Sequence, residues 1–257
     1  MYFERYVGFS VAYPGKIWGF RLVIEGKNMK KVLDFRGNIF RKLPPVGRLG
    51  KIVILLLVIA IAARLCVSCN IIGSARPEYL KTVEMPAWVD QQIIDKGDTS
   101  RTGRPLEKFS NVVVHYVANP MSTAQQNRDY FQSPQSSVSS HFVVGLRGEI
   151  IQCIPLDEQS SASNNRNKDT ISIEVCHPDT TGAFNQATYE SLIKLTAWLC
   201  DIGKLDSEAV IRHYDVTGKE CPKYYVDHPD AWTQFKNDVQ YGIDNYDFAE
   251  MNKAAAQ

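Results

Sequence analysis

The sequence carries little net charge, has few cysteines and shows no internal repeat or low-complexity tract. Its 257 residues have a formal net charge of +1 and include six cysteines. A chain of this length without repeats is expected to form one or two domains, with enough residues for a hydrophobic core. The cysteines after residue 74, other than Cys221, are Cys153, Cys176 and Cys200, which allow at most one disulfide. Each lies among apolar residues and suits a buried thiol, so their redox state stays open.

The small net charge conceals an uneven distribution. Residues 1–51 hold eleven Lys/Arg and three Asp/Glu, a balance of +8, and the rest of the chain has a balance of −7. A basic head on a mildly acidic body favours an address signal in the head. It argues against nucleic acid as a partner of the body.

A long apolar stretch follows the basic head. Residues 52–63 are twelve uninterrupted apolar residues, and after Arg64 the apolar character continues to Gly73. A helix needs about 17–25 residues to span a bilayer, so 52–73 is long enough if Arg64 reaches the interface. We therefore predict a transmembrane segment, with residues 1–51 in the cytoplasm and the body outside the cytoplasmic membrane. The basic residues nearest to the segment are Arg41, Lys42, Arg48 and Lys51.

The fate of this segment is open on the sequence alone. A cleaved signal peptide usually has its basic region within the first 15–30 residues, and about fifty residues precede this one. Translation from Met29 would give a more ordinary start. A cleaved segment would release the body as a secreted protein. Cys69 weakly resembles a lipoprotein cleavage site, but Cys66 stands where such sites usually have leucine, so a plain anchor is preferred.

The remaining chain predicts one α/β domain with a mixed central β-sheet flanked by helices. We expect a stalk over 74–107 with a short helix at Met85–Asp95, the domain over 108–243, and a frayed tail over 244–257. Within the domain the expected strands are Asn111–Val117, Ser139–Gly145, Glu149–Ile154, Thr170–Cys176 and Ala209–Arg212. The expected helices are Ser122–Phe131 with a Ser122 cap, Gln186–Ile202 between an Asn185 cap and a terminating Gly203, and Pro229–Val239.

The motif with the most chemistry lies at 211–222. It places His213, Lys219 and Cys221 at offsets too large for one face of a helix. Gly218 and Pro222 predict a loop that doubles back and brings Cys221 beside His213. Imidazole and thiolate are zinc ligands, and a cation between them stabilises negative charge. An incidental His and Cys on a surface loop is the other interpretation of this motif.

Two strands carry further candidates. His115 lies near the end of the strand 111–117, where residues are delivered to loops, although a lone histidine on a strand is more often part of the core. Glu174 lies among Ile173, Val175 and Cys176. It is either an outward residue of a half-exposed strand or a buried functional base, and the sequence does not choose.

Taken together, His115, Glu174 and the His213/Lys219/Cys221 loop resemble the zinc-dependent N-acetylmuramoyl-L-alanine amidases of the type 2 family. These are related to phage amidase lysozymes and peptidoglycan recognition proteins, and the resemblance covers roughly residues 108–240. It implies Zn²⁺ held by His115, His213 and Cys221, with a fourth position left open. The implied reaction is hydrolysis of the amide between N-acetylmuramic acid and L-alanine in peptidoglycan. Glu174 is then the implied general base, and Lys219 is implied to stabilise the oxyanion.

The sequence departs from the family pattern in two places. Some members have a catalytic tyrosine where this chain has Ser140, so a tyrosine-assisted route is not expected and Glu174 gains weight. The loop that supplies Trp or His to the cleft in many relatives is Ser160–Arg166 here. Of the other histidines, His141 is expected to be structural, and His177 and His228 are expected to be exposed.

Two other functions remain compatible with the residues. A non-catalytic peptidoglycan-binding module could use the same fold, although the presence of Cys221 favours the enzyme. A thiol hydrolase using Cys221 with His213 is weaker, because Pro222 follows the cysteine and no helix N-terminus is evident to lower its pKa.

Overall fold

The computed structural model describes residues 19–26, 29–36, 76–97 and 99–256, which fall into two separate units. The transmembrane segment predicted over 52–73 lies outside these residues. Within the described part of the chain, no helix is both long enough and apolar enough to cross a bilayer.

The first unit contains an antiparallel hairpin. Strand β1 (Gly19–Gly26) pairs with β2 (Met29–Arg36), from Gly19 opposite Arg36 to Gly26 opposite Met29. This hairpin lies within the segment that the sequence marks only by its basic charge.

The second unit is built on a six-stranded mixed sheet in the order β3-β6-β5-β7-β4-β8. Neighbouring strands are parallel except for the β5–β6 hairpin, which is antiparallel. This confirms the predicted mixed α/β architecture. The strands are β3 (Asp90–Gln91), β4 (Asn111–Val114), β5 (Phe142–Val144), β6 (Ile150–Gln152), β7 (Thr170–Val175) and β8 (Val210–Arg212).

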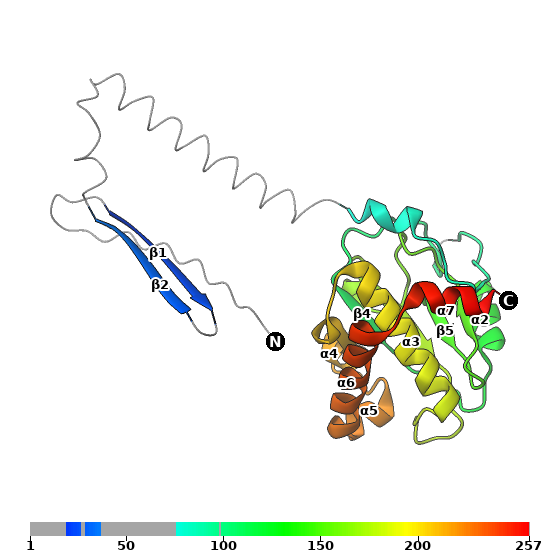
Figure 1. The fold of residues 1–257 in the computed structure, drawn as a ribbon. Helices are drawn as coiled ribbons and strands as arrows, with labels where there is room; N and C mark the ends of the chain where they lie inside the picture. The colour runs from blue at the N-terminus through cyan, green and yellow to red at the C-terminus, as the bar shows by residue number, and fades with distance from the viewer. Residues whose placement is uncertain (1–18, 27–28, 37–75, 98, 257) are drawn as a thin grey trace. The chain divides into compact units, whose positions relative to one another are not determined.

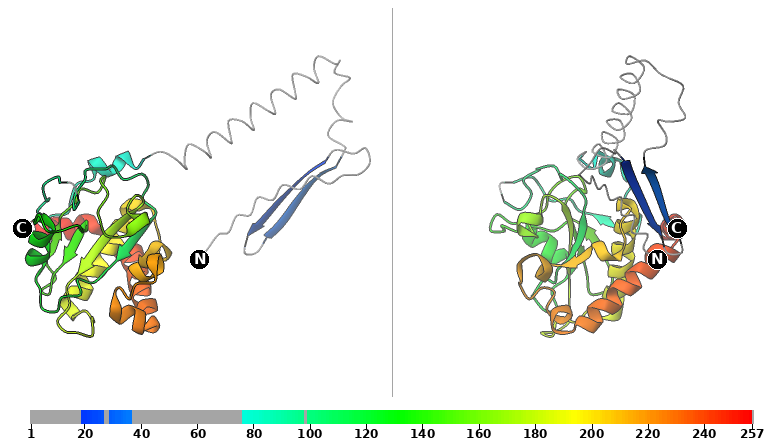
Figure 2. Two further views of the ribbon diagram at one scale, coloured as in Figure 1. Left: turned by 180° about the vertical axis from the view of Figure 1, so that it is seen from behind. Right: turned by 90° about the vertical axis from the view of Figure 1, so that its left-hand side faces the viewer.

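One face of the sheet packs against two long helices. Helix α3 (Gln186–Gly203) and helix α6 (Pro229–Asn245) share the main core with alternate residues of β4 and β7, among them Val112, Val114 and Ile173. Helix α3 stands in front of the strands in Figure 1, and the strands come to the front when the molecule is turned by 180° (Figure 2).

The opposite face has two parts. Near β5 and β6 it is covered by α2 (Ala124–Gln132), whose Ala124 and Phe131 pack with Val143 and Ile151. Near β4 and β7, where successive side chains alternate between faces, it carries Val113, Ser172 and Glu174. A polar site can therefore form on this part of the sheet while the apolar face stays in the core.

Shorter elements complete the second unit. The helices are α4 (His213–Thr217), α5 (Lys223–Asp227) and α7 (Phe248–Ala255), and the 3₁₀ turns are η2 (Glu78–Thr82), η3 (Asn164–Arg166) and η4 (Ser207–Ala209).

Several predicted boundaries differ from the structure. The N-cap of α2 is Thr123, so the predicted Ser122 cap was wrong. The Thr123 side chain accepts from Gln126 N, and the Gln126 side chain accepts from Thr123 N. Asn185 caps α3 as predicted. Gly203 is the last helical residue of α3, and the left-handed residue after it is Lys204.

The regions on either side of the domain are more ordered than the sequence suggested. Met85–Asp95 contains strand β3 instead of a helix, and the expected frayed tail contains α7. The described part of the expected stalk, from residue 76, buries Leu80, Val89 and Leu106 in the main core. It therefore packs as part of the α/β unit.

Candidate metal centre

His115 reaches the site from the end of β4. Its backbone N donates to Ile173 O of β7, which continues the parallel pairing one residue beyond the strand. Because Val112 and Val114 face the core, His115 lies on the opposite face with Val113. Its side chain is buried, with 1% of the residue exposed.

His213 is placed by the neighbouring strand β8. In the β4–β8 register Val114 is the partner of Arg212, so the residues that follow, His115 and His213, come out side by side. Their ring centroids are 4.6 Å apart. Two histidines that are distant in sequence are thus adjacent because two parallel strands end at the same edge of the sheet.

Cys221 is brought back to the same place by the loop after α4. Gly218 ends α4 with a φ of 78°, and Tyr214 N donates to Cys221 O at 2.9 Å, which closes the loop. Gly218 suits this left-handed turn because it has no Cβ. The predicted doubling back of residues 213–221 is therefore confirmed.

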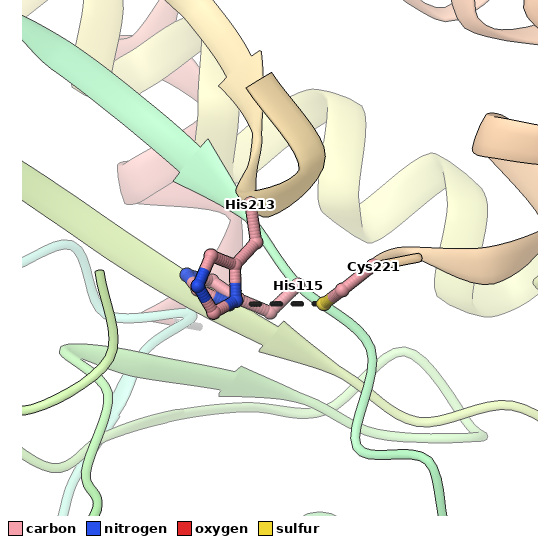
Figure 3. A group of neighbouring side chains, drawn as sticks. All are labelled: His115, His213 and Cys221. Carbon is pink, nitrogen blue, oxygen red and sulfur yellow. Dashed lines mark hydrogen bonds between the residues drawn. The ribbon is translucent and has the colours of Figure 1, made fainter. Parts of the chain in front are cut away.

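The three side chains form a compact, buried cluster (Figure 3). The Sγ atom of Cys221 lies 3.8 Å from His115 Nδ1, and one potential ligand atom from each residue lies within 4.8 Å of the others. His213 Nδ1 is buried without a hydrogen-bond partner. A buried imidazole nitrogen without a partner is unfavourable in the protein alone, so two imidazoles and one thiol fit a zinc ion in both chemistry and geometry.

The electrostatics of the cluster favour neutral ligands in the metal-free protein. Burial, followed by the charges of His213 and Lys219, holds the pKa of His115 well below its usual value. Burial and Lys219 also lower the pKa of His213. Burial raises the pKa of the Cys221 thiol to about 12, against the opposing effects of the Tyr116 backbone and Lys219. Neutral histidine is the form that binds metal, and a thiol bound to a metal loses its proton.

Glu174 lies next to the three residues on β7. Its Oε1 is 4.0 Å from His115 Nδ1, its side chain is 20% exposed, and its Oε2 is buried without a hydrogen-bond partner. Burial raises the pKa of this carboxyl to about 8, while the charge of Lys219 acts to lower it. Ile173 and Val175 are fully buried on the other face. Of the two readings left open by the sequence, the structure matches the buried carboxyl at the site.

Lys219 is exposed at the rim of this cluster. Its positive charge reaches His115, His213, Glu174 and Cys221, because it contributes to the pKa of each of them. The structure therefore brings all five predicted site residues into one region.

Two residues of the site were missed from the sequence. Ser163 Oγ lies 3.3 Å from His115 Nε2, and Asn164 Oδ1 lies 3.0 Å from His213 Nε2. Both belong to the polar loop Ser160–Arg166, where the sequence departs from the family pattern. Ser and Asn are common in any loop, so their residue types gave no signal.

The remaining histidines divide as follows. His141 is structural as predicted: Ser172 N donates to its Nδ1 at 3.0 Å, and its Nε2 lies 2.9 Å from Glu158 O. His228 is exposed as predicted. The prediction for His177 was wrong, because it is 1% exposed, with Nδ1 2.7 Å from Asp179 O and its ring against Tyr116.

The structure also resolves the cysteines of the body. Cys153, Cys176 and Cys200 are buried free thiols, as is Cys221. Burial raises the pKa of each of the first three to about 12, so they are held as neutral thiols.

Comparisons with known proteins point to the same part of the chain. Residues 105–224 match the family described as N-acetylmuramoyl-L-alanine amidase. The chain is similar to the N-acetylmuramoyl-L-alanine amidase BlyA of Bacillus subtilis (strain 168), with 32% identity over 162 residues, 55% of this chain and 44% of BlyA. The amidase CwlL of Bacillus licheniformis is 27% identical over 62% of this chain and 48% of its own length. The chain thus spans about half the length of the curated relatives it matches.

Among solved structures, the fold is similar to the catalytic domain of XlyA. The TM-score is 0.52 at 26% identity, covering 59% of this chain and 98% of that domain. The structure of PlyL has a TM-score of 0.53 at 22% identity, which supports the fold alone.

Proposed function

We propose, from the premise that residues 105–224 match the N-acetylmuramoyl-L-alanine amidase family, that this chain is a zinc-dependent cell-wall amidase. Its substrate would be peptidoglycan or a muropeptide. The bond cleaved would join the lactyl group of N-acetylmuramic acid to the amino group of L-alanine.

The observation that carries this proposal is the meeting of His115, His213 and Cys221 beside Glu174. The three potential ligands come from the end of β4, the start of α4 and the loop after it. Two buried atoms among these residues, His213 Nδ1 and Glu174 Oε2, have no hydrogen-bond partner. A purely structural cluster would be expected to satisfy such atoms.

In the proposed mechanism, His115, His213 and Cys221 would hold zinc, Glu174 would transfer protons, and Lys219 would stabilise negative charge. Zinc in such a site supplies Lewis acidity, which polarises a carbonyl and makes water more acidic. Glu174 would accept the proton of the attacking water and pass it to the leaving amine. Lys219 would stabilise the negative charge that develops on the carbonyl oxygen. A general base must be ionised to accept a proton. The positive charge of a bound zinc ion would lower the pKa of Glu174 and so favour the ionised form.

A zymogram on purified cell walls tests this proposal. Wild-type protein should clear the walls, a chelator should abolish clearing, and added zinc should restore it. Analysis of the products should show new L-alanine amino groups. The variants His115→Ala, His213→Ala and Cys221→Ala should lose most of the metal. Wall binding without product would support the non-catalytic binding module, and full activity without bound metal would refute the zinc site.

We also propose that the domain acts outside the cytoplasmic membrane, tethered by residues 52–73. Support comes from the apolar run, the basic residues before it and the location of peptidoglycan. In cells stripped of their wall, added protease should digest the body and spare the N-terminal segment. Protection of the body would refute this topology, and release of the body by washing would favour a cleaved signal.

A further inference from the structure

Both candidate histidine ligands turn the same ring nitrogen toward the same short segment. The Nε2 atom of His115 faces Ser163 Oγ at 3.3 Å, and the Nε2 atom of His213 faces Asn164 Oδ1 at 3.0 Å. The Nδ1 atoms have no such oxygen partner: that of His115 lies 3.8 Å from Cys221 Sγ, and that of His213 is buried without a hydrogen-bond partner.

This arrangement constrains the tautomer of each ring. A neutral imidazole carries one proton, and only the nitrogen without it can bind a metal. The side-chain oxygen of Asn164 faces His213 Nε2 and can only accept, so this pair forms a hydrogen bond only when Nε2 carries the proton. The lone pair of His213 is then on Nδ1, inside the cluster. Ser163 Oγ can accept from His115 Nε2 in the same way.

The loop that carries Ser163 and Asn164 is itself held in place. Asn167 Oδ1 accepts from Ala162 N at 3.1 Å and from Ser163 N at 2.6 Å. Ser160 Oγ lies 2.8 Å from Ser172 Oγ on β7, which ties the start of the loop to the central sheet. Ser163 is fully buried as a result.

The far end of the loop is tied to the sheet as well. Arg166 pairs with Asp169 at 2.8 Å and donates to Asn111 Oδ1 at the start of β4. Asn164 has a φ of 54°, a left-handed conformation that asparagine tolerates better than most residues. The acceptor on Asn164 is thus presented by a constrained backbone.

We infer that Ser163 and Asn164 are positioning residues that hold His115 and His213 in the tautomer with Nδ1 free, and so set the affinity of the centre for zinc. Partners of this kind orient metal-binding histidines and raise their basicity, and their loss typically costs about 10- to 100-fold in metal affinity. The inference rests on the metal site of the proposed function but does not depend on hydrolysis.

The test measures zinc affinity of the full chain by competition with a chromophoric chelator. Asn164→Gly removes the acceptor and suits the positive φ, and its affinity should fall by about 10- to 100-fold. Asn164→Asp keeps an acceptor and should retain wild-type affinity or exceed it. Ser163→Ala should also lose affinity. The matched control is Asn165→Gly, an exposed neighbour on the same turn, which should bind zinc like the wild type.

A second readout uses the metal-free chain. Nitrogen-15 NMR of the imidazoles should show His213 protonated on Nε2 in the wild type and in Asn164→Asp, and a mixture of tautomers in Asn164→Gly. Wild-type affinity and an unchanged tautomer in Asn164→Gly would overturn the inference. If the wild-type chain binds no zinc, the metal part of the proposed function fails, and the inference about zinc affinity fails with it. Zinc binding without hydrolysis would refute the amidase activity and leave this inference standing.

Discussion

Glu174 stands in the site with one oxygen near His115 and the other buried without a partner. Its raised pKa follows from burial, which disfavours the charged form. The nearby charge of Lys219 opposes that effect. A carboxyl in this position can exchange protons near neutral pH, which is the property that a general base needs.

Replacing Glu174 by Gln keeps the size of the side chain and removes the carboxylate that we propose as the general base. Turnover should fall by about 10²- to 10⁴-fold, while bound zinc and muropeptide affinity should remain. Lys219→Ala should also slow the reaction, and because Lys219 lowers the pKa of Glu174, the acidic limb of its pH–rate profile should move to higher pH. Steady-state kinetics and metal analysis measure both effects. Wild-type turnover in Glu174→Gln with zinc bound would show that the base lies elsewhere.

His141 makes the fold sensitive to acid. Burial lowers its pKa to about 4 from an ordinary value of 6.5. As the pH falls below about 6.5 the unfolded chain takes up a proton that the folded chain refuses, so stability falls until about pH 4. The loss from this residue amounts to about 3 kcal/mol at pH 4.

Denaturant unfolding at pH 7 and pH 4 tests this effect. His141→Gln should be less stable at pH 7, because it disturbs the bonds to Ser172 and Glu158, but it should lose less stability on acidification than the wild type. The exposed His228→Gln serves as the control and should follow the wild type. An equal loss in all three proteins would remove His141 as the cause.

The candidate ligands and Glu174 could be selected from the sequence because their residue types carry specific chemistry and lie at strand ends or in a loop closed by Gly218. Asn164 and Ser163 could not. Their importance depends on the path of an irregular loop across the sheet, which local propensity and periodicity do not encode. His177 was misjudged for the same reason, because the turn that buries its ring is held by contacts to Asp179 and Tyr116.

At the scale of elements, the end of α3 shows how packing competes with local preference. Glycine after a helical pattern usually marks the left-handed residue that ends the helix. Here Lys204 takes that conformation, with a φ of 52°. Gly203 remains helical, and a Cβ on it would lie 2.7 Å from the ring of the buried Phe109. Gly203 is therefore explained by close packing.

Substitutions at Gly203 and Lys204 should change the stability of the fold in opposite directions. Gly203→Ala improves helix propensity by about 1 kcal/mol but forces Phe109 to move, so we expect a net loss of stability. Lys204→Gly relieves the left-handed conformation and should stabilise the fold by up to about 1 kcal/mol. Thermal unfolding of both variants decides the matter. Stabilisation by Gly203→Ala would show that the ring of Phe109 yields without cost.

At the scale of the whole molecule, the α/β unit includes residues that the sequence assigned to a stalk. Leu80, Val89, Ile94 and Leu106 are all buried, and β3 extends the sheet beyond β6. Proline and charged residues separate these apolar side chains, so the segment shows no hydrophobic periodicity that would predict its burial. The central strands and long helices were predictable because their apolar patterns are continuous, and this segment has no such pattern.

Two fragments test that boundary. The fragment 76–257 should fold, and 108–257 should not. Burying each of the four side chains contributes roughly 1.5–3 kcal/mol, which together is comparable to the total stability of about 5–15 kcal/mol of a typical domain. Circular dichroism and calorimetry measure the outcome. If 108–257 unfolds cooperatively at the same temperature as the longer fragment, residues 76–107 are a stalk outside the folded unit.

The short strand β8 gives the site a mechanical property. It has three residues, lies at the edge of the sheet, and pairs with β4. His115 follows β4 and His213 follows β8. An ion bound by both histidines would therefore link these two strands. Zinc should therefore slow amide hydrogen exchange in β8 much more than in the centre of α3, and peeling of this edge should release the ion while the core stays folded. The fraction of protein with bound metal would then report whether β8 is paired with β4.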